Sequence, residues 1–286
     1  MADTAGATAG VSRADGVTDP HALSFRRIFR DCAVAFRRSG FAILAFALVC
    51  AWTQQFRFAS WQSLDFLRIS YRAAYATIVL NRLVQVALAS LGQGAILTFA
   101  ISAMDGEPIG INLADARWAL LRSLRAWPPL FVFYLLMSLS RFIVPLPVGF
   151  GFDIRPLLAA AYAANGFALL LTVWIGIYPP AVVAERRSVF RGVIRADILL
   201  SGRRGRFILV MLLLGAPWLL PGPLFSVALA RGLSLPALSP DVMQAGVWVL
   251  TTALGALWTV GQAAAYRECR RQREGPGAEA QAQIFD

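Results

Sequence analysis

Few side chains in this sequence can support acid–base or metal chemistry. Three carboxylates, Asp105, Glu107 and Asp115, lie close together, and paired carboxylates can bind a cation or act as acid and base. They alternate with glycines and a proline, however, which is more typical of a solvated turn. The one histidine is His21, and the sequence contains no lysine, so a histidine zinc site, a serine–histidine pair and a P-loop lysine are excluded. We expect no enzymatic activity and no cofactor.

The composition instead indicates a membrane protein. Of the 286 residues, 58% are hydrophobic and 15% are charged, against roughly 45–50% and 25% in soluble domains. The basic residues, all arginine, outnumber the acidic ones by 11. Because they flank apolar segments and form no separate polar domain, membrane phospholipid is the expected partner and nucleic acid is not.

Most of the arginines lie in three blocks, each directly before an apolar segment. The blocks are Arg26, Arg27, Arg30, Arg37 and Arg38; Arg117, Arg122 and Arg125; and Arg186, Arg187, Arg191, Arg195, Arg203, Arg204 and Arg206. The periodicity of each block predicts an amphipathic helix, with Asn112 and Ser188 as N-caps of the second and third. Such helices can lie in the headgroup layer of a membrane. The expected headgroup contacts are Arg187, Arg191, Arg195, Arg203, Arg204 and Arg206. The alternative is that these arginines only fix the topology.

Six apolar segments are candidates for membrane spans, because a helix needs about 20 residues to cross a bilayer. They are 40–56, 83–104, 127–148, 157–180, 207–230 and 242–266. The first is the shortest and has a re-entrant or interfacial segment as its alternative. The predicted fold is therefore an all-α polytopic membrane protein with six transmembrane helices.

The positions of the arginines predict the orientation. With both termini in the cytoplasm, 20 arginines lie in cytoplasmic segments and six in outer loops, as the positive-inside rule requires. We predict a disordered cytoplasmic tail over 1–23, a membrane domain over 24–270 and a polar cytoplasmic tail over 271–286.

The arginine blocks and three glycines recur at a similar period. Gly92, Gly176 and Gly261 are separated by 84 and 85 residues and lie in the second, fourth and sixth predicted spans. The chain could therefore contain three repeats of an amphipathic helix followed by a helical hairpin, although any series of similar hairpins would match at a few positions.

Polar residues and prolines inside the spans suggest packing contacts and bends. Neutral amides, next to small residues in most cases, are typical of contacts between helices; they are Gln85, Gln93, Asn165 and Gln262. Pro217, Pro221 and Pro223 should kink or break the fifth span, and Tyr178 with the two prolines after it should end or kink the fourth. Broken helices form substrate sites in transporters, but a plain bend is the simpler interpretation.

One part of the sequence resembles a known family. It begins at Tyr178–Pro179–Pro180, continues through small apolar residues to Glu185, and ends in the arginine–glycine turn 201–206 before Phe207. This pattern is similar to a family of bacterial multi-pass proteins, the glycerophosphoryl diester phosphodiesterase membrane domain. The sequence departs from the family pattern at Ala196 and Asp197. The resemblance implies six helices in a bacterial inner membrane; it implies no phosphodiesterase activity, since the name comes from fusion to a separate catalytic domain.

Two functions are compatible with these features. The first is a non-enzymatic membrane protein that organises lipid or a protein partner at the inner face of the membrane. The second is a small transporter or flippase-like protein that uses the proline-containing fifth span.

Overall fold

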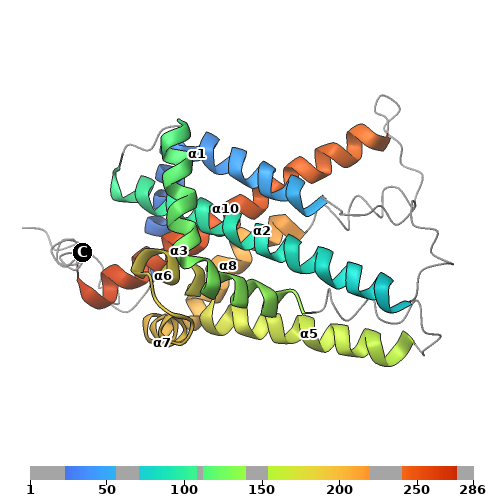
Figure 1. Ribbon diagram of the computed structural model, residues 1–286. Coiled ribbons are helices and arrows are strands. Elements are labelled where there is room, and N and C mark those ends of the chain that lie inside the picture. Colours follow the sequence, from blue (N-terminus) through green and yellow to red (C-terminus); the bar gives the residue numbers. More distant parts are fainter. Residues whose placement is uncertain (1–22, 56–70, 108–111, 140–153, 220–239, 276–286) are drawn as a thin grey trace, which may run out of the picture.

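The computed structural model describes residues 23–55, 71–107, 112–139, 154–219 and 240–275 (Figure 1). Within these residues the chain is helical and contains no strand, which confirms the all-α prediction for them. The helices are α1 (Phe25–Gln55), α2 (Tyr71–Asp105), α3 (Leu113–Met137), α5 (Ile154–Ile175), α6 (Tyr178–Glu185), α7 (Val189–Leu200), α8 (Arg204–Leu219) and α10 (Pro240–Glu274).

Three of these helices are long and apolar enough to cross a membrane. The candidate spans are Phe25–Trp52 in α1, Val79–Asp105 in α2 and Ala245–Glu274 in α10. They include most of the predicted first, second and sixth spans and indicate a membrane protein. The third and fifth predicted spans continue into 140–153 and 220–239, which lie outside the described residues.

The fourth predicted span is divided between two helices. Helix α5 ends at Ile175 and α6 begins at Tyr178, with Gly176 between them. The prediction that Tyr178 and the two following prolines end or kink the span was wrong in position, because they begin α6 instead. Proline is favourable there, since the first N–H groups of a helix have no intrahelical acceptor.

The three arginine-rich segments differ in how they join the helices that follow them. In α1 the chain bends at Ser39 (φ −132°, ψ 16°), and α3 contains Pro128 and Pro129 and bends along its length (Figure 1). The third segment forms the separate helix α7, and a turn containing Gly202 at φ +77° leads into α8. The expectation that all three run directly into a span was therefore wrong for the third. In Figure 1, α7 is seen nearly end-on while α2 and α5 lie in the plane, so α7 lies across these helices.

Helix α2 packs against α1, α3 and α10, and close contacts between small residues hold it there. A Cβ atom at Gly92 would collide with Cys50 of α1, and one at Gly94 would collide with Ser123 of α3. The hydroxyl of Ser123 donates a 2.7 Å hydrogen bond to the backbone oxygen of Leu91. Small residues thus allow the backbones to approach, as is usual where helices meet within a membrane.

The predicted amides have different environments. Gln93 Oε1 accepts a 2.6 Å hydrogen bond from the hydroxyl of Thr259, which connects α2 with α10. Gln262 Nε2 donates to the backbone oxygen of Gly176, 3.1 Å away, and so satisfies a carbonyl at the break between α5 and α6. The packing prediction is confirmed for these two amides. It is wrong for Asn165, which is exposed among the described residues.

The spaced glycines follow the proposed repeat only in part. Gly92 in α2 lies against α1, and Gly261 in α10 lies against Leu214 of α8, so each packs on the preceding helix of its expected hairpin. Gly176 instead lies at a helix break, against Phe207 of α8. The middle unit therefore departs from the other two, and the threefold repeat stays a prediction.

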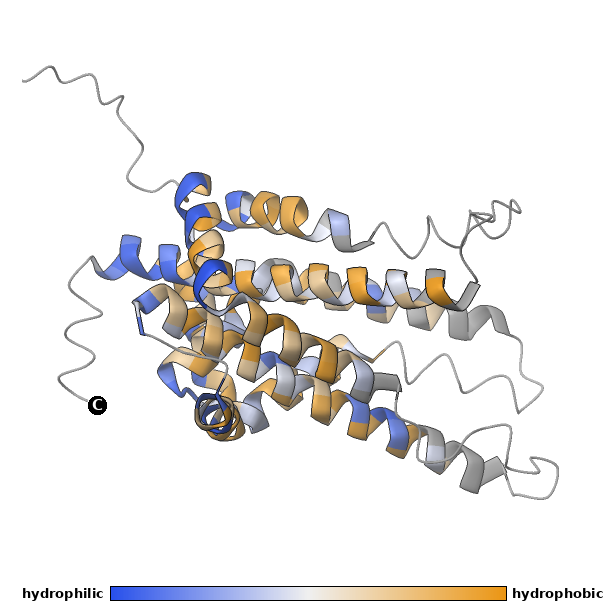
Figure 2. Ribbon diagram, turned by 90° about the horizontal axis from the view of Figure 1, so that it is seen from above, coloured by the Kyte–Doolittle hydropathy of each residue, from blue (hydrophilic) through white to orange (hydrophobic). Residues whose placement is uncertain are grey.

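Hydrophilic residues gather at one end of the helices. Figure 2 shows them around the last turns of α10. Helix α10 continues to Glu274, four residues beyond the boundary predicted at 270, and Arg271 and Glu274 of its last turns pair with other helices. At the other boundary, Leu23 is buried and α1 begins at Phe25. Residues 1–22 and 276–286, most of the two predicted tails, lie outside the described residues.

Candidate functional site at the arginine-rich end

We use the term arginine-rich end for the start of α1, the end of α2, the helices α6 and α7, the start of α8 and the last turns of α10. Two ionic clusters lie there, and α10 contributes to both. One joins α10 to α6 and α7, and the other joins α10 to α1 and α2.

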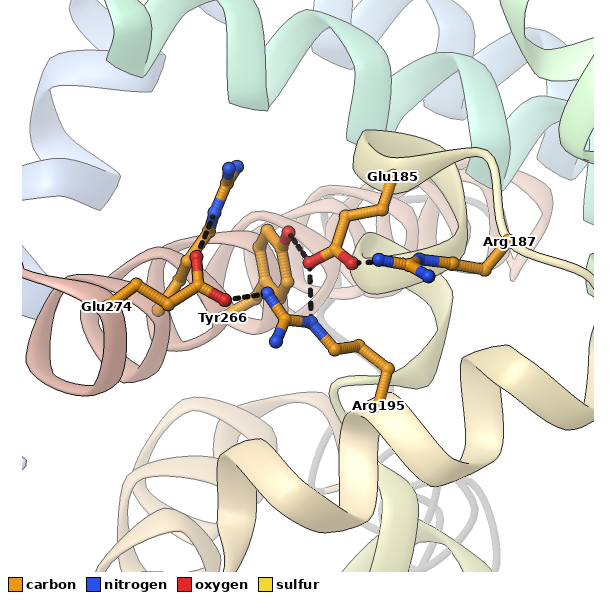
Figure 3. Close-up of polar contacts among 6 residues, drawn as sticks. Glu185, Arg187, Arg195, Tyr266 and Glu274 are labelled. Carbon is orange, nitrogen blue, oxygen red and sulfur yellow. Dashed lines mark hydrogen bonds and ion pairs between the residues drawn. The ribbon is translucent and has the colours of Figure 1, made fainter. Parts of the chain in front are cut away.

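The first cluster surrounds Glu185, the last residue of α6 (Figure 3). Glu185 Oε1 accepts hydrogen bonds of 2.8 Å from both Arg195 Nε and the Tyr266 hydroxyl. Its Oε2 accepts a 3.2 Å hydrogen bond from Arg187 Nε. Arg195 also pairs with Glu274 of α10. One carboxylate thus holds side chains from α7 and α10 together.

Burial makes this cluster stronger than an ordinary surface pair. The Glu185 side chain is 9% exposed and that of Arg195 is 21% exposed. Desolvation alone would lower the pKa of Arg195, but the hydrogen bonds and charges of Glu274 and Glu185 outweigh it and raise the pKa. Arg195 therefore stays charged and acts as a link between helices, and we assign it no proton-transfer role.

The second cluster surrounds Asp31 of α1, a residue that is 4% exposed. Arg271 Nη1 lies 3.0 Å from Asp31 Oδ2, and Arg267 Nη1 lies 3.9 Å from the same oxygen. Arg267 Nη2 also lies 2.9 Å from Asp105 Oδ1 at the end of α2. The second cluster therefore fixes the end of α10 to two neighbouring helices.

The three carboxylates that sequence placed together have separate roles. Asp105 pairs with Arg267, so the expectation that it only solvates a turn was wrong. The backbone N–H of Asp115 donates to Asn112 Oδ1 at 2.7 Å, which confirms Asn112 as the N-cap of α3. Glu107 is exposed. In the part of the chain that the structure describes, no group of three histidine, cysteine or acidic side chains could hold a metal ion.

The structure divides the six predicted headgroup contacts into three pairs. Arg203 is only 6% exposed, and Arg195 is partly buried and pairs with Glu185. Arg187 and Arg204 are partly exposed but pair with carboxylates of this chain. Arg191 and Arg206 are exposed and form no ion pair or hydrogen bond with the described residues. Only the last pair leaves its full charge to an external partner.

Helix α7 also exposes an apolar face. Phe190 is 81% exposed, and Ile194 and Ile198 are exposed on the same helix. Its other face packs on α6 through Gly192, where a Cβ atom would lie 2.8 Å from the ring of Tyr178. Ser188 is at the N-cap position of α7, as predicted, although its side chain makes no capping hydrogen bond.

A second apolar surface lies on the amphipathic part of α3. Its exposed residues are Leu113, Leu120, Leu121 and Leu124. The guanidinium of Arg122 lies over the ring of Trp118, 5.4 Å from its centroid, and Arg117 and Arg125 are exposed. Apolar and cationic side chains are thus exposed together on α3 as well, as in helices that bind membrane surfaces.

The proline-containing fifth span is described only in its first part. Pro217 lies inside α8, which continues as a helix to Leu219, so Pro217 does not break it. Pro221 and Pro223 lie outside the described residues. Within the described residues, the interrupted predicted span is the fourth, at Gly176.

Sequence reasoning missed most of the residues that form the two clusters. The sequence pattern marks Glu185 only as part of the family resemblance, and Tyr266 only as the end of a span and part of that resemblance. No local pattern singles out Asp31. The i,i+4 spacing of Arg270 and Glu274 was an available signal that helix α10 continues to residue 274.

The chain matches no protein-family model, no curated protein and no solved structure. The resemblance stated from Tyr178 to Phe207 therefore stays a prediction. The function has to be argued from the arginine-rich end itself.

Proposed function

We propose that this is a non-enzymatic protein of a bacterial inner membrane that organises anionic phospholipid at the cytoplasmic face. In this proposal the chain has six spans and both termini are cytoplasmic. Three long apolar helices support the membrane location, and the positive-inside rule supports a cytoplasmic arginine-rich end. The resemblance to the bacterial membrane family supports the number of spans.

The observation that carries this proposal is the exposed surface of α7. It presents Phe190, Ile194 and Ile198 together with the exposed, unpaired Arg191. When such a helix lies in the headgroup layer, its apolar side chains can enter the acyl region while its guanidinium groups reach lipid phosphates. The crosswise direction of α7 in Figure 1 suits a helix lying along the membrane surface.

The ionic clusters reduce the charge that is available to lipid. Of the seven arginines in the third block, Arg186, Arg191 and Arg206 are exposed and have no partner among the described residues. At about 1 kcal/mol for each basic residue near an anionic surface, they would contribute about 3 kcal/mol. The paired arginines would contribute less, because carboxylates of the chain already compensate them.

The proposal is tested by lipid selectivity. The full-length protein is reconstituted in bilayers, and the association of spin-labelled phosphatidylglycerol is compared with that of spin-labelled phosphatidylcholine. We expect the wild type to prefer the anionic lipid, R191Q/R206Q to lose much of this preference and R191K/R206K to keep it. Equal association of both lipids with the wild type would contradict the proposal. An unchanged preference in R191Q/R206Q would mean that α7 and α8 do not bind the anionic lipid through these arginines.

A transporter is the second candidate, and the interrupted helix at Gly176 favours it. Discontinuous helices with backbone groups freed inside the membrane form substrate sites in several transporters. Here Gln262 donates a hydrogen bond to the Gly176 oxygen, so the break is equally compatible with a bend that holds no substrate. A change in solute or lipid flux between proteoliposomes of wild type and Q262L would favour transport. Absence of flux with both proteins would count against it.

The exposed surface of α7 could also receive a protein partner. If the partner is a protein that recognises the guanidinium groups, R191Q/R206Q and R191K/R206K should weaken its binding alike. If the partner is lipid, binding should depend on charge alone, so only R191Q/R206Q should weaken it.

A further inference from the structure

A cavity opens beside the bend of α1, near the end of α2. Its volume is about 390 Å³, and among the described residues Val34, Arg37 and Arg38 line it. The bend is at Ser39, which directly follows the two arginines. Cavities of about 300–1,000 Å³ are large enough for small ligands.

Arg38 is held in position by the neighbouring helix. Its Nη1 donates a 3.0 Å hydrogen bond to the backbone oxygen of Ala103 near the end of α2. Gly106, with φ +91°, lies at the end of α2, and a Cβ atom there would be 3.4 Å from Arg38 Nη1. This contact orders the guanidinium before any ligand arrives, which lowers the entropic cost of binding.

The charge at this cavity is not compensated within the described residues. Arg37 and Arg38 form no ion pair with them, although α1 and α2 contain Asp31 and Asp105. Both of those carboxylates are paired with arginines of α10. Arg37 and Arg38 are both exposed beside this cavity, so their two adjacent positive charges favour an anion, and guanidinium groups match the oxygens of a phosphate well.

We propose that Arg37 and Arg38 form a discrete binding site for a phosphate group. The bend separates the amphipathic first half of α1 from its apolar second half, so the cavity lies at the depth expected for headgroup phosphates. The ligand is then the phosphodiester of an anionic phospholipid or a free phosphate compound. Binding of a phospholipid at this site rests on the proposed function, whereas binding of a free phosphate compound does not.

The test measures ligand occupancy of the full-length protein in detergent. Native mass spectrometry counts the phosphatidylglycerol molecules retained, and inorganic phosphate is titrated as a competitor. We expect one phosphatidylglycerol to be retained more tightly than the others. In R37Q/R38Q its dissociation constant should rise at least about tenfold, since two charge-assisted contacts are lost. Displacement by millimolar phosphate would identify a site for free phosphate; resistance to it would identify a lipid site.

Two further variants test whether R37Q/R38Q loses the lipid because this site is lost, and not because of a general loss of charge or misfolding. R26Q/R117Q removes the same charge from two exposed arginines outside the cavity and should leave the tight lipid in place. V34F fills the cavity without changing any charge and should release it. The proposal is overturned if no single tight phosphate ligand is found, if V34F retains it, or if R26Q/R117Q and R37Q/R38Q lose it equally. A general lipid preference that persists in R37Q/R38Q would leave the proposed function intact.

Discussion

Replacing Glu185 by glutamine should destabilise the helical bundle measurably. The change keeps the shape of the side chain but removes the charge that pairs with Arg195 and Arg187. An amide oxygen can still accept the hydrogen bond from Tyr266. The loss is therefore chiefly electrostatic.

The expected magnitude follows from the burial of the pair. Exposed ion pairs contribute about 0–1 kcal/mol, whereas removing one partner of a buried pair costs about 3–5 kcal/mol. Glu185 is 9% exposed and Arg195 is 21% exposed, and Arg195 keeps Glu274 as a second partner. We therefore expect E185Q to lower the free energy of unfolding by about 2 kcal/mol, between these two limits.

The assay is equilibrium unfolding of the full-length protein in mixed micelles with increasing sodium dodecyl sulfate, followed by tryptophan fluorescence. D197N is the matched control, because Asp197 also pairs with an arginine, Arg204, but both side chains are more than 40% exposed. We expect D197N to cost less than about 1 kcal/mol. A double-mutant cycle with R195Q should show coupling between residues 185 and 195. Equal effects of E185Q and D197N, or no coupling, would refute this reasoning.

Three more substitutions test the packing around α6. G192A should destabilise the protein by about 1–3 kcal/mol, because its Cβ would press on Tyr178; unchanged stability would mean that α7 does not pack closely on α6. Y178F removes the hydrogen bond to the Pro129 oxygen and should cost about 1 kcal/mol in the same assay. Q262L leaves the Gly176 oxygen without its hydrogen bond and should lower the free energy of unfolding by about 1–3 kcal/mol. Unchanged stability would mean that this hydrogen bond does not stabilise the break between α5 and α6.

Apolar patterning was sufficient to predict the helical class and the long helices. The predicted segments 83–104 and 242–266 fall within α2 and α10, since a run of about 20 apolar residues has few alternatives to a spanning helix. The Asn112 cap was also predictable, because it depends on residues three positions apart. Local patterns of this kind determine local structure.

The candidate site was harder to predict because it depends on contacts between distant residues. Arg195 and Arg191 look alike in sequence, one helical turn apart. The structure gives Arg195 two carboxylate partners, one of them 79 residues away, and leaves Arg191 exposed. Likewise, the two prolines after Tyr178 permit either the end or the start of a helix, and the packing of Tyr178 against Pro129 and Phe133 favours the start.

We propose that the arginines of this end fall into two classes, one that fixes helices together and one that binds lipid. The most direct test measures lipid selectivity and unfolding free energy on the same two charge-matched variants, R191Q/R206Q and R195Q/R271Q. We expect the first variant to lose its preference for phosphatidylglycerol over phosphatidylcholine and to keep its stability. The second should lose stability and, while folded, keep the preference. If the two variants change both quantities alike, the division of the arginines is wrong.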